Sequence, residues 1–185
     1  MKNAVVEGKF PSWYSNQISE NMETNTNLKP DIHFKRITAR TVREICALSE
    51  TLPPEQRKMV AHNGDSIAQA HFSENAWFRA IYADETPIGF LMLHIGLDYE
   101  DGIDNRGVFL WRLMIARPYQ GKGYGKEAME FLFKHLKAQG FPELFTSCVQ
   151  GEGSPEGFYR KLGFVTTGEK YGEEIELVYK VSAYK

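Results

Sequence analysis

Three glycines alternate with larger residues in the segment Gln120-Gly121-Lys122-Gly123-Tyr124-Gly125-Lys126, where an apolar run gives way to a helical pattern. Glycine permits positive φ and close approach to the backbone, so successive N–H groups can face one concavity at the start of a helix. Such a concavity suits a phosphate or pyrophosphate, and Lys122 and Lys126 would add positive charge. An ordinary connection between a strand and a helix is the structural alternative for the same residues.

Two other phosphate-binding motifs do not fit this segment. A Walker loop requires G-x-x-x-x-G-K-[ST], whereas Gly121 and Gly125 are one residue too close and Glu127 follows Lys126. A dinucleotide-binding fingerprint requires G-x-G-x-x-G early in a βαβ unit, whereas this run reads G-x-G-x-G and comes late in the chain. The segment therefore predicts neither a P-loop nor a Rossmann domain.

The spacing Gln120-x-x-Gly123-x-Gly125 resembles the Q/R-x-x-G-x-G/A acyl-CoA loop of the GCN5-related N-acetyltransferases, the GNAT family. Upstream, residues 113–118 resemble that family's central strand and its exit, and downstream residues 158–164, FYRKLGF, resemble its FY-x-K-x-GF signature. The resemblance covers roughly residues 31–181. A looser similarity, resting on the glycine loop, the strand before it and the ending TGE at 167–169, points to bacterial spermine/spermidine-type acetyltransferases.

The resemblance implies that acetyl-CoA is the co-substrate and that a primary amine attacks its thioester directly. It places the pyrophosphate on the glycine loop and the pantetheine arm along the central strand. The cofactor-binding residues predicted in this way are Leu113, Met114, Ile115, Gln120, Gly121, Lys122, Gly123, Tyr124, Gly125 and Lys126. Tyr159 matches the family tyrosine that protonates the departing thiolate, although a tyrosine after Phe158 on a short helix is otherwise a half-buried packing residue.

The general base is not where many family members carry one, because Trp111 and Arg112 occupy the expected positions on the central strand. Water or another carboxylate must serve, and the candidates lie in predicted loops, where a solvated charge is the plain alternative: Glu85, Asp98, Glu100, Asp101 and Asp104. Four of these carboxylates fall within residues 98–104 and would attract a polycation. Glu100 and Asp101 are therefore predicted to bind a cationic acceptor.

Hydrophobic periodicity predicts an α/β chain with mixed strand directions. The resemblance specifies the GNAT fold: a mixed, twisted α+β sheet of about six to seven strands with helices on both faces. Strand 108–115 should be central and splayed from strand 144–149. The other expected elements are a strand at 31–37, helices at 41–48, 55–61 and 66–72, a hairpin of 77–83 with 88–95, helices ending at 139 and spanning 156–162, and a closing hairpin of 164–167 with 175–181.

Composition limits the remaining possibilities. The 185 residues suit one domain, which we place at residues 31–185 behind an N-terminal extension at 1–30. The net charge of −2 argues against a nucleic-acid partner, and no apolar run is long enough for a membrane helix or a signal peptide. Cys46 and Cys148 belong to no cluster, so no metal and no disulfide framework are predicted, and a cytoplasmic location is expected.

Two function classes follow from these observations. The first is an N-acetyltransferase for a small, cationic, polyamine-like amine, with an aminoglycoside or a peptide N-terminus as alternative acceptors. The second is a catalytically idle CoA-binding or sensor domain of the same fold, because fold does not fix function. A homodimer is compatible with either class. The aromatic residues of the extension could dock it onto the domain, and the extension could cover the acceptor site, dock in a dimer or stay mobile.

Overall fold

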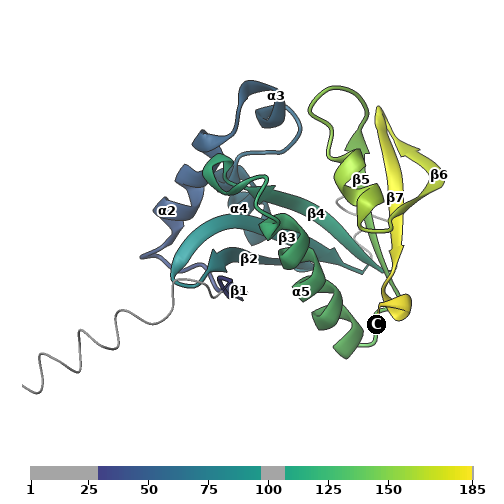
Figure 1. Ribbon diagram of the computed structural model, residues 1–185, viewed down its shortest axis with the longest axis horizontal. Helices are drawn as coiled ribbons and strands as arrows, with labels where there is room; N and C mark the ends of the chain where they lie inside the picture. Colours follow the sequence, from purple (N-terminus) through teal and green to yellow (C-terminus); the bar gives the residue numbers. More distant parts are fainter. Residues whose placement is uncertain (1–28, 97–106, 185) are drawn as a thin grey trace, which may run out of the picture. The chain divides into compact units, whose positions relative to one another are not determined.

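The structure is a computed structural model that describes residues 29–96 and 107–184. Within these ranges the chain forms one seven-stranded sheet in the order β1-β2-β3-β4-β5-β7-β6 (Figure 1). All neighbouring strands are antiparallel except β4 and β5, which are parallel. The predicted mixed sheet is thus confirmed, and its strands are β1 Ile32–Lys35, β2 Ala76–Ala83, β3 Thr86–Ile95, β4 Val108–Ile115, β5 Glu143–Val149, β6 Val165–Tyr171 and β7 Glu174–Lys180.

Helices cover both faces of the sheet. The helices are α2 Val42–Ala47, α3 Pro54–Arg57, α4 Asn63–Phe72, α5 Tyr124–Ala138 and α6 Glu156–Lys161, with 3₁₀ turns η1 Leu48–Thr51, η2 Arg117–Tyr119 and η3 Val181–Ala183. Alternate strand residues face opposite helices: Leu91 packs with the α5 side chains, whereas Phe90 packs with Ile45 of α2 and Ile67 of α4. Burying each such side chain stabilises the fold by about 1.5–3 kcal/mol.

The parallel pair β4 and β5 is joined for only two residues. Val108 pairs with Leu144 and Phe109 with Phe145, and from Leu110 onward the strands diverge, as the ribbons in Figure 1 show. On its other side β5 pairs with β7 over its whole length. The predicted splay is therefore confirmed, and it leaves a stretch of the β4 backbone edge without a neighbouring strand.

The segment before β2 differs from the expectation. Residues 55–61 do not form one helix, because α3 ends at Arg57, and α4 begins at Asn63 rather than at Ser66. Asn63 and Gly64, which fall in the gap between the expected helices 55–61 and 66–72, form the first turn of α4. Its conformation is stabilised by the His62 ring, whose Nδ1 accepts from the Gly64 amide at 3.0 Å, and by burial of Asn63.

Two sequence predictions lie outside the described residues. The extension at 1–30 is described only from Lys29, and the acidic loop with Glu100 and Asp101 falls between the two described ranges. In the ranges 29–96 and 107–184 no helix is long and apolar enough to cross a membrane.

Candidate functional site

A cavity of about 990 Å³ opens where β4 and β5 diverge. Its walls come from residues 109–115 of β4, residues 146–149 of β5, residues 56–61 after η1 and the start of α5. This volume is at the upper end of the range for small-molecule sites. The missing strand pairing thus opens a site between sheet residues that lie far apart in the sequence.

The glycine loop enters the cavity in two different conformations. Gly121 and Gly123 have φ of 74° and 88°, and Gly123 is the left-handed residue that starts α5. Gly125 was also expected to use positive φ, but it lies inside the helix; an added Cβ there would meet the Phe158 ring at 3.4 Å. Two glycines therefore shape the turn and the third allows close packing, leaving the first N–H groups of a 15-residue helix beside the cavity.

Gln120 ties this loop to the rest of the site. Its Nε2 donates to the Ile115 carbonyl at the end of β4 and to Gln56 Oε1, both at 2.8 Å. Gln56 Nε2 donates back to Gln120 Oε1 at 3.3 Å. The motif glutamine thus positions the loop against both the central strand and the wall formed after η1.

Eight of the ten predicted cofactor-binding residues line the cavity. The exceptions are Lys122 and Tyr124. Lys122 is exposed, with its Nζ 5.8 Å from the centre of the Tyr119 ring, and Tyr124 packs against the main core. The structure therefore brings together Leu113, Met114, Ile115, Gln120, Gly121, Gly123, Gly125 and Lys126.

Tyr159 lies in the cavity wall where the strands begin to separate, and only 5% of its surface is exposed. Burial raises the pKa of its phenol well above the ordinary value, and a hydrogen bond with Thr146 opposes that effect. Thr146 Oγ1 in turn donates to the Leu110 carbonyl at 3.1 Å. The phenol is thus kept protonated, with Thr146 fixed beside it.

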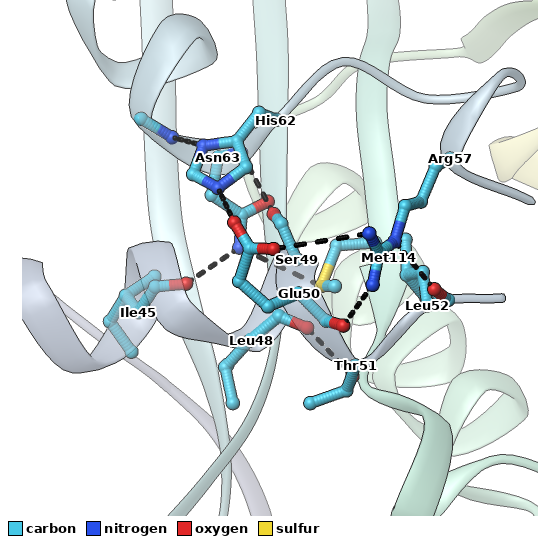
Figure 2. Close-up of polar contacts among 11 residues, drawn as sticks. Ile45, Leu48, Ser49, Glu50, Thr51, Leu52, Arg57, His62, Asn63 and Met114 are labelled. Atoms are coloured by element: carbon cyan, nitrogen blue, oxygen red, sulfur yellow. Dashed lines mark hydrogen bonds and ion pairs between the residues drawn. The ribbon is translucent and has the colours of Figure 1, made fainter. Parts of the chain in front are cut away.

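A polar network fixes the wall on the α2 and α4 side of the cavity (Figure 2). Asn63 is fully buried, and its backbone N–H donates to Ser49 Oγ at 2.9 Å. Its side-chain Nδ2 donates to the Ile45 carbonyl at 2.8 Å and lies 3.7 Å from Met114 Sδ. Arg57 donates to the Leu52 carbonyl at 2.7 Å and to the Glu50 carbonyl. The contact of Asn63 with Met114 connects this network to β4.

One cavity carboxylate was missed in the sequence. Glu174, at the start of β7, lines the cavity and accepts a hydrogen bond from Ser147 Oγ. It is the only acidic side chain among the described lining residues. Its charge adds to the rise that burial causes in the pKa of Tyr159, and it opposes the lowering that burial causes in the pKa of Arg112. In the sequence it follows a glycine turn and another glutamate, so it looks like solvated turn charge. By contrast, the predicted candidate Glu85 is 90% exposed and paired with Lys35 at 2.7 Å.

Arg112 brings a positive charge to the same cavity. Its Nη1 donates to the Trp111 carbonyl at 2.8 Å, its Nη2 donates to Gln69 Oε1 at 3.2 Å, and its guanidinium carbon lies 5.3 Å from the centre of the Trp111 ring. Burial lowers the pKa of Arg112, and the charge of Glu174 opposes that shift. A cation thus occupies the strand position where an acid was sought.

Comparisons with known proteins agree with this architecture. The probable spermine N(1)-acetyltransferase of Bacillus subtilis subsp. natto is 29% identical over 90 residues, 48% of this chain, and the match spans 59% of that relative's length. An acetyltransferase from Thermus thermophilus superposes with a TM-score of 0.67 at 14% identity, covering 83% of this chain and 99% of that one. The PaiA N-acetyltransferase of Thermoplasma acidophilum, solved in complex with coenzyme A, gives 0.57 at 20% identity, covering 81% and 99%.

The model of the acetyltransferase (GNAT) family matches residues 42–164, which run from α2 to the residue before β6. This range includes the glycine loop, the splayed strands and Tyr159. The chain therefore belongs to the acetyltransferase (GNAT) family.

Proposed function

We propose that the protein is an N-acetyltransferase that transfers the acetyl group of acetyl-CoA directly to a primary amine, and that its acetyltransferase domain spans residues 31–185. One observation carries this proposal: the β4 edge is unpaired beyond Phe109, and a glycine loop and a buried tyrosine lie along it. An unpaired strand edge offers backbone donors and acceptors to an extended ligand. Family membership supports the same conclusion.

Acetyl-CoA fits the residues present in the cavity. The first N–H groups of α5 and the backbone of the glycine loop would bind the pyrophosphate, with Lys126 adding charge. The backbone of Leu113, Met114 and Ile115 would pair with the pantetheine arm. An added Cβ at Gly125 would lie in van der Waals contact with the Phe158 ring, so this position of the loop packs directly against the second motif.

Tyr159 and Glu174 divide the proton transfers. Glu174 accepts a proton from the incoming ammonium, since it is the one described carboxylate in the cavity wall. Tyr159 donates a hydrogen bond to the departing thiolate, and its raised pKa favours a shared proton over complete transfer. The amine loses two protons overall: one ends on the thiol and the other leaves through Glu174 to solvent.

A pH profile tests the role of Glu174. We expect Glu174→Gln to lower kcat/KM near neutral pH by about 10²-fold, and the loss should shrink as pH rises and the acceptor amine deprotonates by itself. Glu173→Gln is the matched control, because Glu173 is exposed in the turn and does not line the cavity. Equal losses at all pH values would assign Glu174 a structural role instead.

A polyamine is one candidate acceptor for the proposed reaction. It is supported by the names of the curated relatives and by the acidic loop at 98–104, of which the structure describes nothing. A small amine acceptor and a cytoplasmic location accord with the proposal.

Thiol release from acetyl-CoA tests the proposed function. The purified protein is assayed with monoamines, polyamines, an aminoglycoside, amino acids and a peptide N-terminus, and acetylated product is identified by mass. Turnover of any amine class supports an acetyltransferase. Tight binding of coenzyme A without acetylation of any member of the panel would favour a binding or sensor domain.

A further inference from the structure

Arg112 and Glu174 lie on one face of the sheet. Met114 packs with the α2 and α4 side chains, and Arg112, two residues earlier on β4, shares its side. On β7 the neighbouring Ile175 packs in the opposite core with α5, so Glu174 points to the face that Arg112 uses. The two opposite charges therefore border the opening between β4 and β5 from its two sides.

These two charges face the same cavity without pairing. Within the described ranges no ion pair joins Arg112 to Glu174, although the charge of Glu174 is near enough to affect the Arg112 pKa. Glu174 is bonded to Ser147 on β5, and Arg112 is bonded to Gln69 on α4. Each charge is thus fixed to its own side of the opening.

The guanidinium of Arg112 retains donor capacity. Arginine has five N–H donors, and the contacts to Trp111 and Gln69 use one on Nη1 and one on Nη2. Its Nε is shielded from solvent and has no partner among residues 29–96 and 107–184. Because the group is partly desolvated and its orientation is fixed, a carboxylate would bind it more strongly than water does.

We infer that the acceptor is a small primary amine that also carries a carboxylate, with its amine at Glu174 and its carboxylate at Arg112; this inference rests on the proposed function. A second ammonium group in the place of the carboxylate would meet Arg112 as a like charge. The other charged side chains described in the cavity wall, Arg57, Lys58 and Lys126, are also cations. An amino acid matches this pattern of charges better than a polyamine does.

A matched set of amines tests the inference. The set contains four primary amines of similar size. 4-Aminobutyrate and 2-aminopentanoate also carry a carboxylate, butylamine carries no second charged group, and 1,4-diaminobutane carries a second ammonium group. We expect kcat/KM for at least one of the two amino acids to exceed that of butylamine and of 1,4-diaminobutane by about 10-fold or more. Arg112→Gln should remove that advantage, so that this variant turns over neither amino acid faster than it turns over butylamine. Arg112→Lys should restore only part of it, because lysine lacks the planar fork.

Arg79→Gln is the matched control. Arg79 also donates to the carbonyl of its preceding residue, Phe78, at 2.7 Å and also lies over a tryptophan ring, Trp77, at 4.4 Å, but it does not line the cavity. Its loss should leave the ranking of the four amines unchanged. A loss of ranking in this variant would mean that Arg112→Gln acts through general damage to the sheet.

Binding separates failure of this inference from failure of the proposed function. Calorimetry measures how the same four compounds bind to the coenzyme A complex of each variant, without turnover. Binding of an amino acid that depends on Arg112, with no acetylation of any amine, would support the acceptor class and overturn the enzyme. Turnover in which butylamine or 1,4-diaminobutane equals both amino acids, or in which neither amino acid binds, would overturn the acceptor class and leave the acetyltransferase intact.

Discussion

Tyr159→Phe removes the hydroxyl group that the proposed mechanism uses and keeps the ring. The centre of the Tyr159 ring lies 5.3 Å from that of the Phe164 ring and 5.5 Å from that of the Phe158 ring, and these contacts persist in the variant. Thr146 loses its bond with the phenol but still donates to the Leu110 carbonyl. The free energy of unfolding should therefore fall by only about 0.5–1.5 kcal/mol, whereas kcat should fall by about 10²-fold.

Thr146→Val provides the comparison for this prediction. Valine has a similar shape, but it leaves both the Leu110 carbonyl and the Tyr159 hydroxyl without their partner. The unfolding free energy should fall by about 1–3 kcal/mol, more than in Tyr159→Phe, while kcat falls only about 10-fold because the proton donor remains. Thr146→Val should thus be the less stable of the two variants, and Tyr159→Phe should have the lower kcat.

The assay measures thiol release with saturating acetyl-CoA and with an amine that the unmodified protein acetylates. The conditions are chosen so that the chemical step limits turnover. Denaturant unfolding gives the stability of the same preparations, and the Kd for coenzyme A checks the cofactor site. Unaltered kcat in Tyr159→Phe would refute the proposed role of Tyr159. A larger loss of kcat in Thr146→Val than in Tyr159→Phe would show that positioning, not the proton donor, limits the reaction.

Three further predictions concern the loop, the wall and pH. Gly123→Val should weaken coenzyme A binding by about 10- to 100-fold, because valine resists a φ of 88°. Gly140→Val is the control: Gly140 has a φ of 81° but lies away from the cavity, so this variant should lose stability and keep its affinity for coenzyme A. Equal Kd values for coenzyme A in the two variants would contradict the prediction. Asn63→Leu should lower the unfolding free energy by about 1–3 kcal/mol, measured in denaturant, because the Ile45 carbonyl loses its donor. The raised pKa of Tyr159 stabilises the fold below the ordinary tyrosine pKa of about 10, so stability should fall as pH rises above that value, and less steeply in Tyr159→Phe.

Several elements were predictable because local pattern and burial coincide. The apolar run 108–115 is buried or partly buried along its whole length, and it appears as β4 with the predicted bounds. The helical stripe before Gly140 forms α5, which buries Ala128, Leu132 and Leu136. The glycine loop was recognisable because its backbone conformation calls for glycine at set positions, which spacing in the sequence records directly.

The bounds of two elements were less predictable. The start of α4 depends on the His62 ring, which is not a usual helix cap, and on the buried side chain of Asn63, which lies one residue inside the helix. Strand β6 continues past Thr167 to Tyr171 through a register shift around Gly168, because pairing with β7 compensates for the glycine. At the start of α4, contacts of Asn63 with Ser49 and Ile45 override a local turn signal, and in β6 the pairing with the next strand of the same hairpin does so.

By itself the sequence determined the family, the central strand, the glycine loop and the position of the tyrosine, because each is encoded in a short segment. Only the tertiary structure decided which charges meet in the cavity. Glu174 lies opposite Val149 because β7 pairs antiparallel to β5, and that register brings it to the opening that Arg112 borders from β4. Strand pairing depends on contacts between segments far apart in the chain, so no local pattern around either residue could show that they share a site.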